Sequence, residues 1–118
     1  MGRKSRAVRL LRKTMDERTT IIDKVRNYGV LLRNSNFPMK IDKMYLFGSY
    51  AKGNPHEDSD IDVALVVRKW KGDYFDVIPL LWKLRSYIDL RIEPHVIVPK
   101  EDFAGFLDEI QENGILIN

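Results

Sequence analysis

The chain has 118 residues, with 20 Lys and Arg, 17 Asp and Glu, and a net charge of +3. Residues 1–15 hold six basic and no acidic side chains, so the rest of the chain carries 14 basic against 17 acidic groups. Because the excess positive charge lies in one short segment, nucleic-acid binding by the rest of the chain is disfavoured. The absence of cysteine excludes disulfides, thiol catalysis and Cys-ligated zinc, and no apolar run reaches the roughly 20 residues of a membrane helix.

The first half of the chain predicts one helix and two strands. Apolar residues recur at three- and four-residue steps from Asp16 to about Arg33, which indicates an amphipathic helix. The apolar run 44–47 predicts a short strand, followed by one helical turn and a loop over 50–59. The nearly continuous apolar segment 61–67 is typical of a central strand.

The second half predicts two further helices around a strand. A helix beginning at residue 73 or 74 tolerates Pro79 only in its first turn. A strand over 91–98 contains Pro94, which indicates a sheet edge or a bulge. The last helix is predicted over 100–113, before a short tail or strand at 115–117. Its inward side chains are Phe103, Phe106, Leu107 and Ile110.

This order predicts an α/β class fold, with a small mixed sheet flanked by helices. The length suits a single domain over residues 1–118. Residues 1–13 form a basic N-terminal segment, either frayed or continuous with the first helix. The basic start lacks the apolar stretch of a secretory signal, so we expect a cytoplasmic protein without membrane association.

Two carboxylates at the start of the central strand point to metal chemistry. Asp60 and Asp62 are two residues apart, so both side chains face the same side of a strand. Like charges placed together repel and lose hydration. Divalent cations between them would relieve this, and oxygen ligands suit Mg²⁺.

A phosphate-binding turn precedes these carboxylates. Gly48 after a strand lets a ligand approach the backbone, Ser49 begins a helical turn with free N–H groups, and Lys52 adds positive charge. Alone, each feature is more often a turn or a solvated strand start. Together they favour metal-dependent handling of a nucleoside triphosphate.

Gly48-Ser49, Lys52-Gly53 and Ser59-Asp60-Ile61-Asp62 together resemble the motif of the polymerase β-like nucleotidyltransferase superfamily, in particular its minimal, MNT-type members. The resemblance implies that Asp60 and Asp62 bind two Mg²⁺ ions. It also implies that Gly48 and Ser49 hold the triphosphate of ATP or another nucleotide, assisted by Lys52.

The resemblance further implies a third carboxylate on a later strand. Glu93, followed at the expected spacing by the segment 99–103, fits best as general base or second metal ligand, although the family more often has Asp there. Asp89 shares its strand parity and stays an alternative. His95 could face the site, but we favour a satisfied strand residue; His56 could contact a base or phosphate, but we favour an exposed loop residue. Tyr50 could either line the pocket or pack.

The function so implied is transfer of a nucleoside monophosphate, AMP from ATP, to a hydroxyl. The resemblance implies a HEPN-type protein partner whose tyrosine is modified, in a toxin–antitoxin-like module where this chain is the antitoxin, so we expect a hetero-complex or an oligomer. One alternative is a non-catalytic toxin-neutralising or nucleotide-binding module. Nucleotide addition to a nucleic-acid end, guided by residues 1–13, is less favoured.

Overall fold

The computed structural model describes residues 6–35, 37–56, 58–70, 74–102 and 104–118, without the side chains of 10–16, 69, 70 and 74. Four strands form one sheet in the order β3-β2-β1-β4, with β3 parallel to β2 and the other pairs antiparallel. The predicted mixed α/β fold is confirmed. The elements are α1 (Arg6–Asn34), β1 (Met39–Phe47), α2 (Ser49–Lys52), β2 (Ile61–Trp70), α3 (Tyr74–Arg85), β3 (Ile92–Ile97), a 3₁₀ turn (Pro99–Glu101), α4 (Phe106–Asn113) and β4 (Ile115–Leu116).

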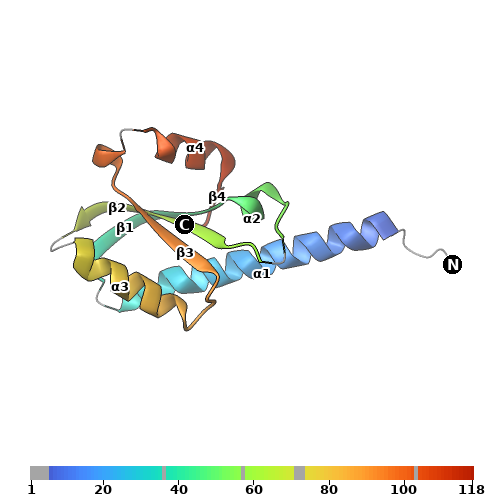
Figure 1. The fold of residues 1–118 in the computed structure, drawn as a ribbon, viewed down its shortest axis with the longest axis horizontal. Coiled ribbons are helices and arrows are strands. Elements are labelled where there is room, and N and C mark those ends of the chain that lie inside the picture. Colours follow the sequence, from blue (N-terminus) through green and yellow to red (C-terminus); the bar gives the residue numbers. More distant parts are fainter. Residues whose placement is uncertain (1–5, 36, 57, 71–73, 103) are drawn as a thin grey trace.

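Helices cover both faces of the sheet: α1 and α3 lie on one side and α4 on the other (Figure 1). Side chains alternate along β2, so Ile61 and Val63 pack toward α1 and α3, whereas Ala64 and Val66 join the smaller core under α4. Burial of both faces explains the continuous apolar run in this strand and confirms its central position. The edge position of β3 likewise confirms the interpretation of Pro94.

The main core is closed by a hydrogen bond between two helices. Tyr28 of α1 is fully buried, and its hydroxyl donates to the Leu81 carbonyl of α3 at 2.8 Å. Burial disfavours the phenolate and so raises the pKa of Tyr28 above its ordinary value, while the charge of Arg85 acts in the opposite direction. Val77, Leu81 and Leu84 form the buried side of α3.

The first helix and the first strand are longer than predicted. Helix α1 begins at Arg6, so the described part of the basic segment continues the first helix, which was one of the two alternatives for it. Arg, Ala, Leu and Lys are good helix formers that extend a helix beyond its packed face. Strand β1 begins at Met39 instead of Met44. Its pairing with β2 is irregular near Ile41, so this part of the strand lacks the regular alternation of buried and exposed residues that predicts a strand. Among the described residues, no helix is long and apolar enough to cross a membrane.

Helix α3 begins at Tyr74, as predicted, but the predicted place of Pro79 in its first turn and the predicted start of the last helix were wrong. Pro79 is the sixth residue of α3, beyond the first turn, where it lacks the N–H that would donate to the carbonyl four residues earlier. The last helix begins at Phe106 instead of Lys100, because Gly105 takes a left-handed conformation and the Asp102 carboxylate accepts the N–H groups of Phe106 and Leu107. Phe106 remains 37% exposed, and Phe103 lies outside the described residues.

We predict that Tyr28→Phe lowers the free energy of unfolding by about 1 kcal/mol, because it removes the buried hydrogen bond from the Tyr28 hydroxyl to the Leu81 carbonyl. Urea denaturation of the variant and the parent chain measures this difference. Tyr87→Phe is the matched control, since Tyr87 is 68% exposed and the same change there should cost less than about 0.5 kcal/mol. Equal midpoints for all three proteins would contradict the structural role of this bond.

Candidate functional site

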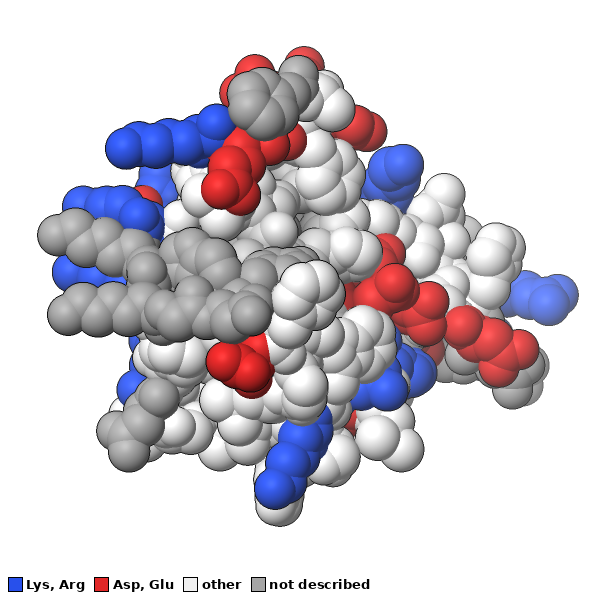
Figure 2. All heavy atoms as spheres, turned by 60° about the vertical axis from the view of Figure 1, so that its left-hand side comes forward, with Lys and Arg blue, Asp and Glu red and all other residues white. Residues whose placement is uncertain are grey.

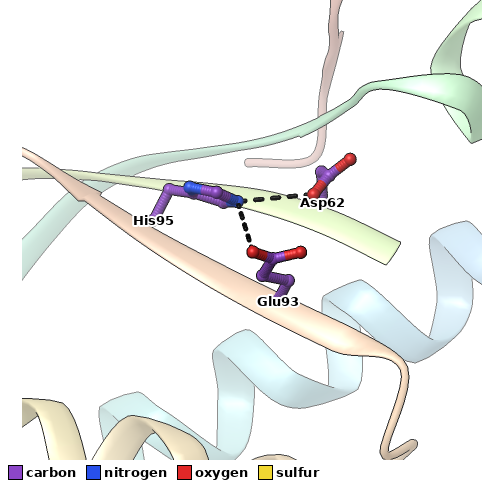
Figure 3. Close-up of side chains that lie close together, drawn as sticks. All are labelled: Asp62, Glu93 and His95. Atoms are coloured by element: carbon purple, nitrogen blue, oxygen red, sulfur yellow. Dashed lines mark hydrogen bonds and ion pairs between the residues drawn. The ribbon is translucent and has the colours of Figure 1, made fainter. Parts of the chain in front are cut away.

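Three ligand-type side chains meet on the α4 side of the sheet, at the start of the parallel β2–β3 pair (Figure 3). Asp62 is the register partner of Glu93, and His95 is two residues further along β3, so all three share one face. His95 Nε2 lies 3.3 Å from Asp62 Oδ1 and 4.0 Å from Glu93 Oε1. One ligand atom from each residue lies within 4.8 Å of the others.

Asp60, the residue directly before β2, brings a third carboxylate close to Asp62 and Glu93. The pKa of Glu93 is raised above its ordinary value, first by partial withdrawal from water, then by a hydrogen bond with Asp60 and by the negative charges of Asp62 and Asp60. His95 opposes this shift. Three mutually repelling carboxylates that remain partly open to solvent are a donor set that fits a divalent cation, and oxygen ligands suit Mg²⁺.

Asp89 is engaged elsewhere. Its carboxylate accepts hydrogen bonds from Lys24 Nζ at 2.8 Å and from the backbone N–H and guanidinium of Arg91, and its side chain is 11% exposed. The hydrogen bond from Arg91 is the largest cause of an Asp89 pKa well below the ordinary value. Asp89 thus joins α1 to the start of β3, whereas Glu93 lies beside Asp62.

The predicted phosphate-binding residues lie next to the carboxylates. Gly48 has φ 74° and ψ −153°, a backbone conformation that is essentially reserved for glycine. A β-carbon at this position would collide with Asp62 Oδ2, so the carboxylate packs directly on the Gly48 backbone. Gly48 is the N-cap of α2, and among the described residues no side chain caps this N-terminus.

A cavity of about 240 Å³ opens beside Gly48, between the end of β1 and α4. It is lined by Phe47, Gly48, Lys52, Phe106, Glu109, Ile110, Asn113 and Gly114. Phe47 also contacts the rings of His95 and Phe106 edge-on, at 5.0 and 5.6 Å between centroids. The cavity therefore lies next to the carboxylate site, because Phe47 and Gly48 line it and also contact His95 and Asp62. Lys52, the predicted cation, borders the cavity.

His95 is the site residue that sequence reasoning undervalued. We expected a satisfied strand residue, but its ring approaches both Asp62 and Glu93. Its two-residue spacing from Glu93 was the signal, because side chains at that spacing share a face. His56 is exposed, as expected, and Tyr50 packs in the core, where its hydroxyl accepts a hydrogen bond from Arg91 at 2.8 Å.

Comparison with known proteins assigns the class. The family model described as polymerase beta, nucleotidyltransferase matches residues 30–118, so the chain belongs to this family and is a nucleotidyltransferase. The chain is 32% identical over 78 residues, 64% of its own length and 78% of the relative, to MJ0141 of Methanocaldococcus jannaschii, which bears the name of a protein adenylyltransferase.

Two further similarities refine this assignment. The chain is 37% identical over 70 residues to the protein adenylyltransferase MntA of Shewanella oneidensis, and the match covers 57% of this chain and about half, 47%, of that relative. A crystal structure of a toxin–antitoxin with AMP-PNP superposes with a TM-score of 0.61 at 29% identity, and the match covers 79% of this chain and 72% of that one. The resemblance to the MNT-type group is thereby confirmed.

We predict that Gly48→Ala displaces the Asp62 carboxylate, because the new methyl group occupies its position. The positive φ adds a cost of about 1–3 kcal/mol in unfolding free energy. Gly105→Ala is the control: its φ is also positive, 71°, but nothing lies within 4 Å of the added carbon. His95 ring resonances report the Asp62 position, and they should move clearly more in Gly48→Ala; equal shifts in both variants would contradict this contact.

The Asp89 ion pairs predict a pH-dependent stability. Since its folded-state pKa lies below the unfolded value of about 3.9, Asp89 contributes stability above that pH, and the contribution is lost as pH falls through the folded-state pKa. Asp89→Asn should therefore cost about 1.5–3 kcal/mol at pH 7, and clearly less near pH 2, in urea unfolding. Asp23 forms an exposed ion pair with Arg26 and is the control: Asp23→Asn should lower the free energy of unfolding by less than about 0.5 kcal/mol. A pH-independent loss for Asp89→Asn would refute this role.

Proposed function

We propose that the chain transfers AMP from ATP to a hydroxyl group of a protein partner, with Mg²⁺ as the required cation. The observation that carries this proposal is the convergence of Asp60, Asp62 and Glu93 beside the open N-terminus of α2. A carboxylate group that holds cations, next to backbone N–H groups that receive phosphate, is the arrangement that nucleotidyl transfer needs. Membership of the nucleotidyltransferase family supports the same reaction class.

Each side chain has a defined task in this proposal. Asp60 and Asp62 hold the cations, and Glu93 is the third carboxylate, because Asp89 is already paired with Lys24 and Arg91. Bound cations supply charge neutralisation at the phosphates. Gly48 and Ser49 orient the triphosphate through the first N–H groups of α2, and Lys52 at the rim of the cavity pairs with its negative charge.

The bond changes follow from this placement. The acceptor hydroxyl oxygen forms a bond to the α-phosphorus of ATP, the bond from that phosphorus to the bridging oxygen breaks, and pyrophosphate leaves. The hydroxyl proton goes to Glu93 or to water.

The acceptor belongs, in this proposal, to a HEPN-type protein that the chain neutralises as an antitoxin in the cytoplasm. The names of the relatives support it, since two are named protein adenylyltransferases and one similar solved structure is a toxin–antitoxin. Part of the surface also suits a protein partner. Phe75 and Trp82 of α3 and the following Tyr87 and Leu90 are exposed large apolar side chains.

The same exposed group favours a second candidate, a non-catalytic module that neutralises a toxin by binding alone. A nucleic-acid acceptor is less favoured. On the face shown in Figure 2, acidic and basic side chains are both present. A nucleic-acid track is instead expected to be a stripe of Lys and Arg.

We predict that the double change Asp60→Asn and Asp62→Asn lowers label transfer from ATP to the HEPN-type partner by about 100-fold or more, because the cation ligands are lost. The assay is incubation with labelled ATP, Mg²⁺ and the product of the neighbouring gene. Asp58→Asn is the matched control, since this exposed loop carboxylate neighbours the site in sequence and should leave the rate unchanged. Neutralisation that survives the double change, without any transfer by the parent chain, would establish the binding module instead.

A further inference from the structure

The cluster of side chains around Asp62 and Glu93 contains an imidazole, which a magnesium site built from oxygen ligands does not need. His95 turns its Nε2 atom toward Asp62 and Glu93 (Figure 3). Across the described parts of the chain, these three residues are the one group of Asp, Glu, His or Cys side chains close enough to share an ion. The β2–β3 register fixes the juxtaposition, because Glu93 lies opposite Asp62 and His95 follows on the same face.

The two distances from His95 suit ligands of a single cation, and the three ligand atoms all lie within 4.8 Å of one another. Oxygen and nitrogen ligands lie about 2.1 Å from a first-row transition ion, so two ligands of one ion are at most about 4.2 Å apart. His95 Nε2 is 3.3 Å from Asp62 Oδ1 and 4.0 Å from Glu93 Oε1, both within this limit. All three side chains are between 24% and 38% exposed, so an ion can reach them from solvent.

The donor types decide which ion this position prefers. Mg²⁺ takes oxygen ligands, whereas imidazole nitrogen is a good ligand for first-row transition ions. Asp60 lies outside this group of three and hydrogen-bonds Glu93. The edge-on contact with Phe47, at 5.0 Å between centroids, packs the imidazole against a ring that supplies no competing ligand.

We propose that Asp62, Glu93 and His95 form a binding position for a first-row transition cation, such as Mn²⁺, Co²⁺ or Zn²⁺, with His95 Nε2 as a ligand. The binding position itself does not depend on the proposed function. Only its consequence does: in the nucleotidyl transfer, one of the two cation positions would be filled by a transition ion in preference to Mg²⁺. The competing explanation is a metal-free contact in which His95 is only an ion-pair partner of the two carboxylates.

Direct metal binding by the untagged chain, without nucleotide or partner, tests the proposal. The sequence has two histidines, so ring spectra of the ¹⁵N-labelled parent chain contain His95 and His56 alone, and His56 serves as an internal control in an exposed loop. We expect Zn²⁺ to move the Nε2 resonance of His95 and to leave His56 nearly unchanged. If both rings respond alike, or neither responds, the proposal is wrong.

Variants separate the imidazole from the carboxylates. In calorimetric titration with Co²⁺, His95→Asn should weaken binding about ten-fold or more, His56→Asn less than two-fold, and Mg²⁺ binding should change less than three-fold in either variant. Equal Co²⁺ affinity in the parent and His95→Asn would overturn the proposal. Because no nucleotide is present in this titration, that result would not contradict the proposed AMP transfer. Intact Co²⁺ binding without label transfer would instead contradict the proposed function and not the metal-binding position.

Discussion

The parallel pairing of β2 with β3 is the constraint on which the site depends. It places Glu93 opposite Asp62 and His95 on the same face, although Asp62 and Glu93 are 31 positions apart in the sequence. Parallel pairing needs a crossover, which α3 provides by packing Val77 and Leu81 against the main core. Burial of this crossover therefore holds the carboxylates together, at a distance where they repel.

The repulsion is concentrated where the core ends. Strand β2 is buried on both faces over most of its length. The two carboxylates at its start, Asp60 just before the strand and Asp62 within it, remain partly open to solvent. Farther along the same face, Ala64 and Val66 pack under α4. A strand with an apolar body and charged start can be held rigidly by its body while its charged end stays accessible to cations and phosphate.

The uneven charge of the chain has a structural counterpart. The N-terminal part of α1 extends beyond the sheet (Figure 1), and it carries basic residues from Arg6 onward. The carboxylates Asp62 and Glu93 belong to the sheet, on its far side from α1, and Asp60 directly precedes β2. The basic segment and the acidic site are thus separate features, and the overall net charge describes neither.

The sequence by itself determined the class of fold, the central position of β2 and the motif residues from Gly48 to Asp62, because these depend on local spacing and on continuous apolar runs. It left Asp89 and Glu93 as alternatives and undervalued His95. Only the tertiary structure separated them, since it pairs Asp89 with Lys24 of α1 and sets Glu93 beside Asp62. Such contacts depend on strand register and helix packing between distant segments, which residue spacing along the chain does not encode.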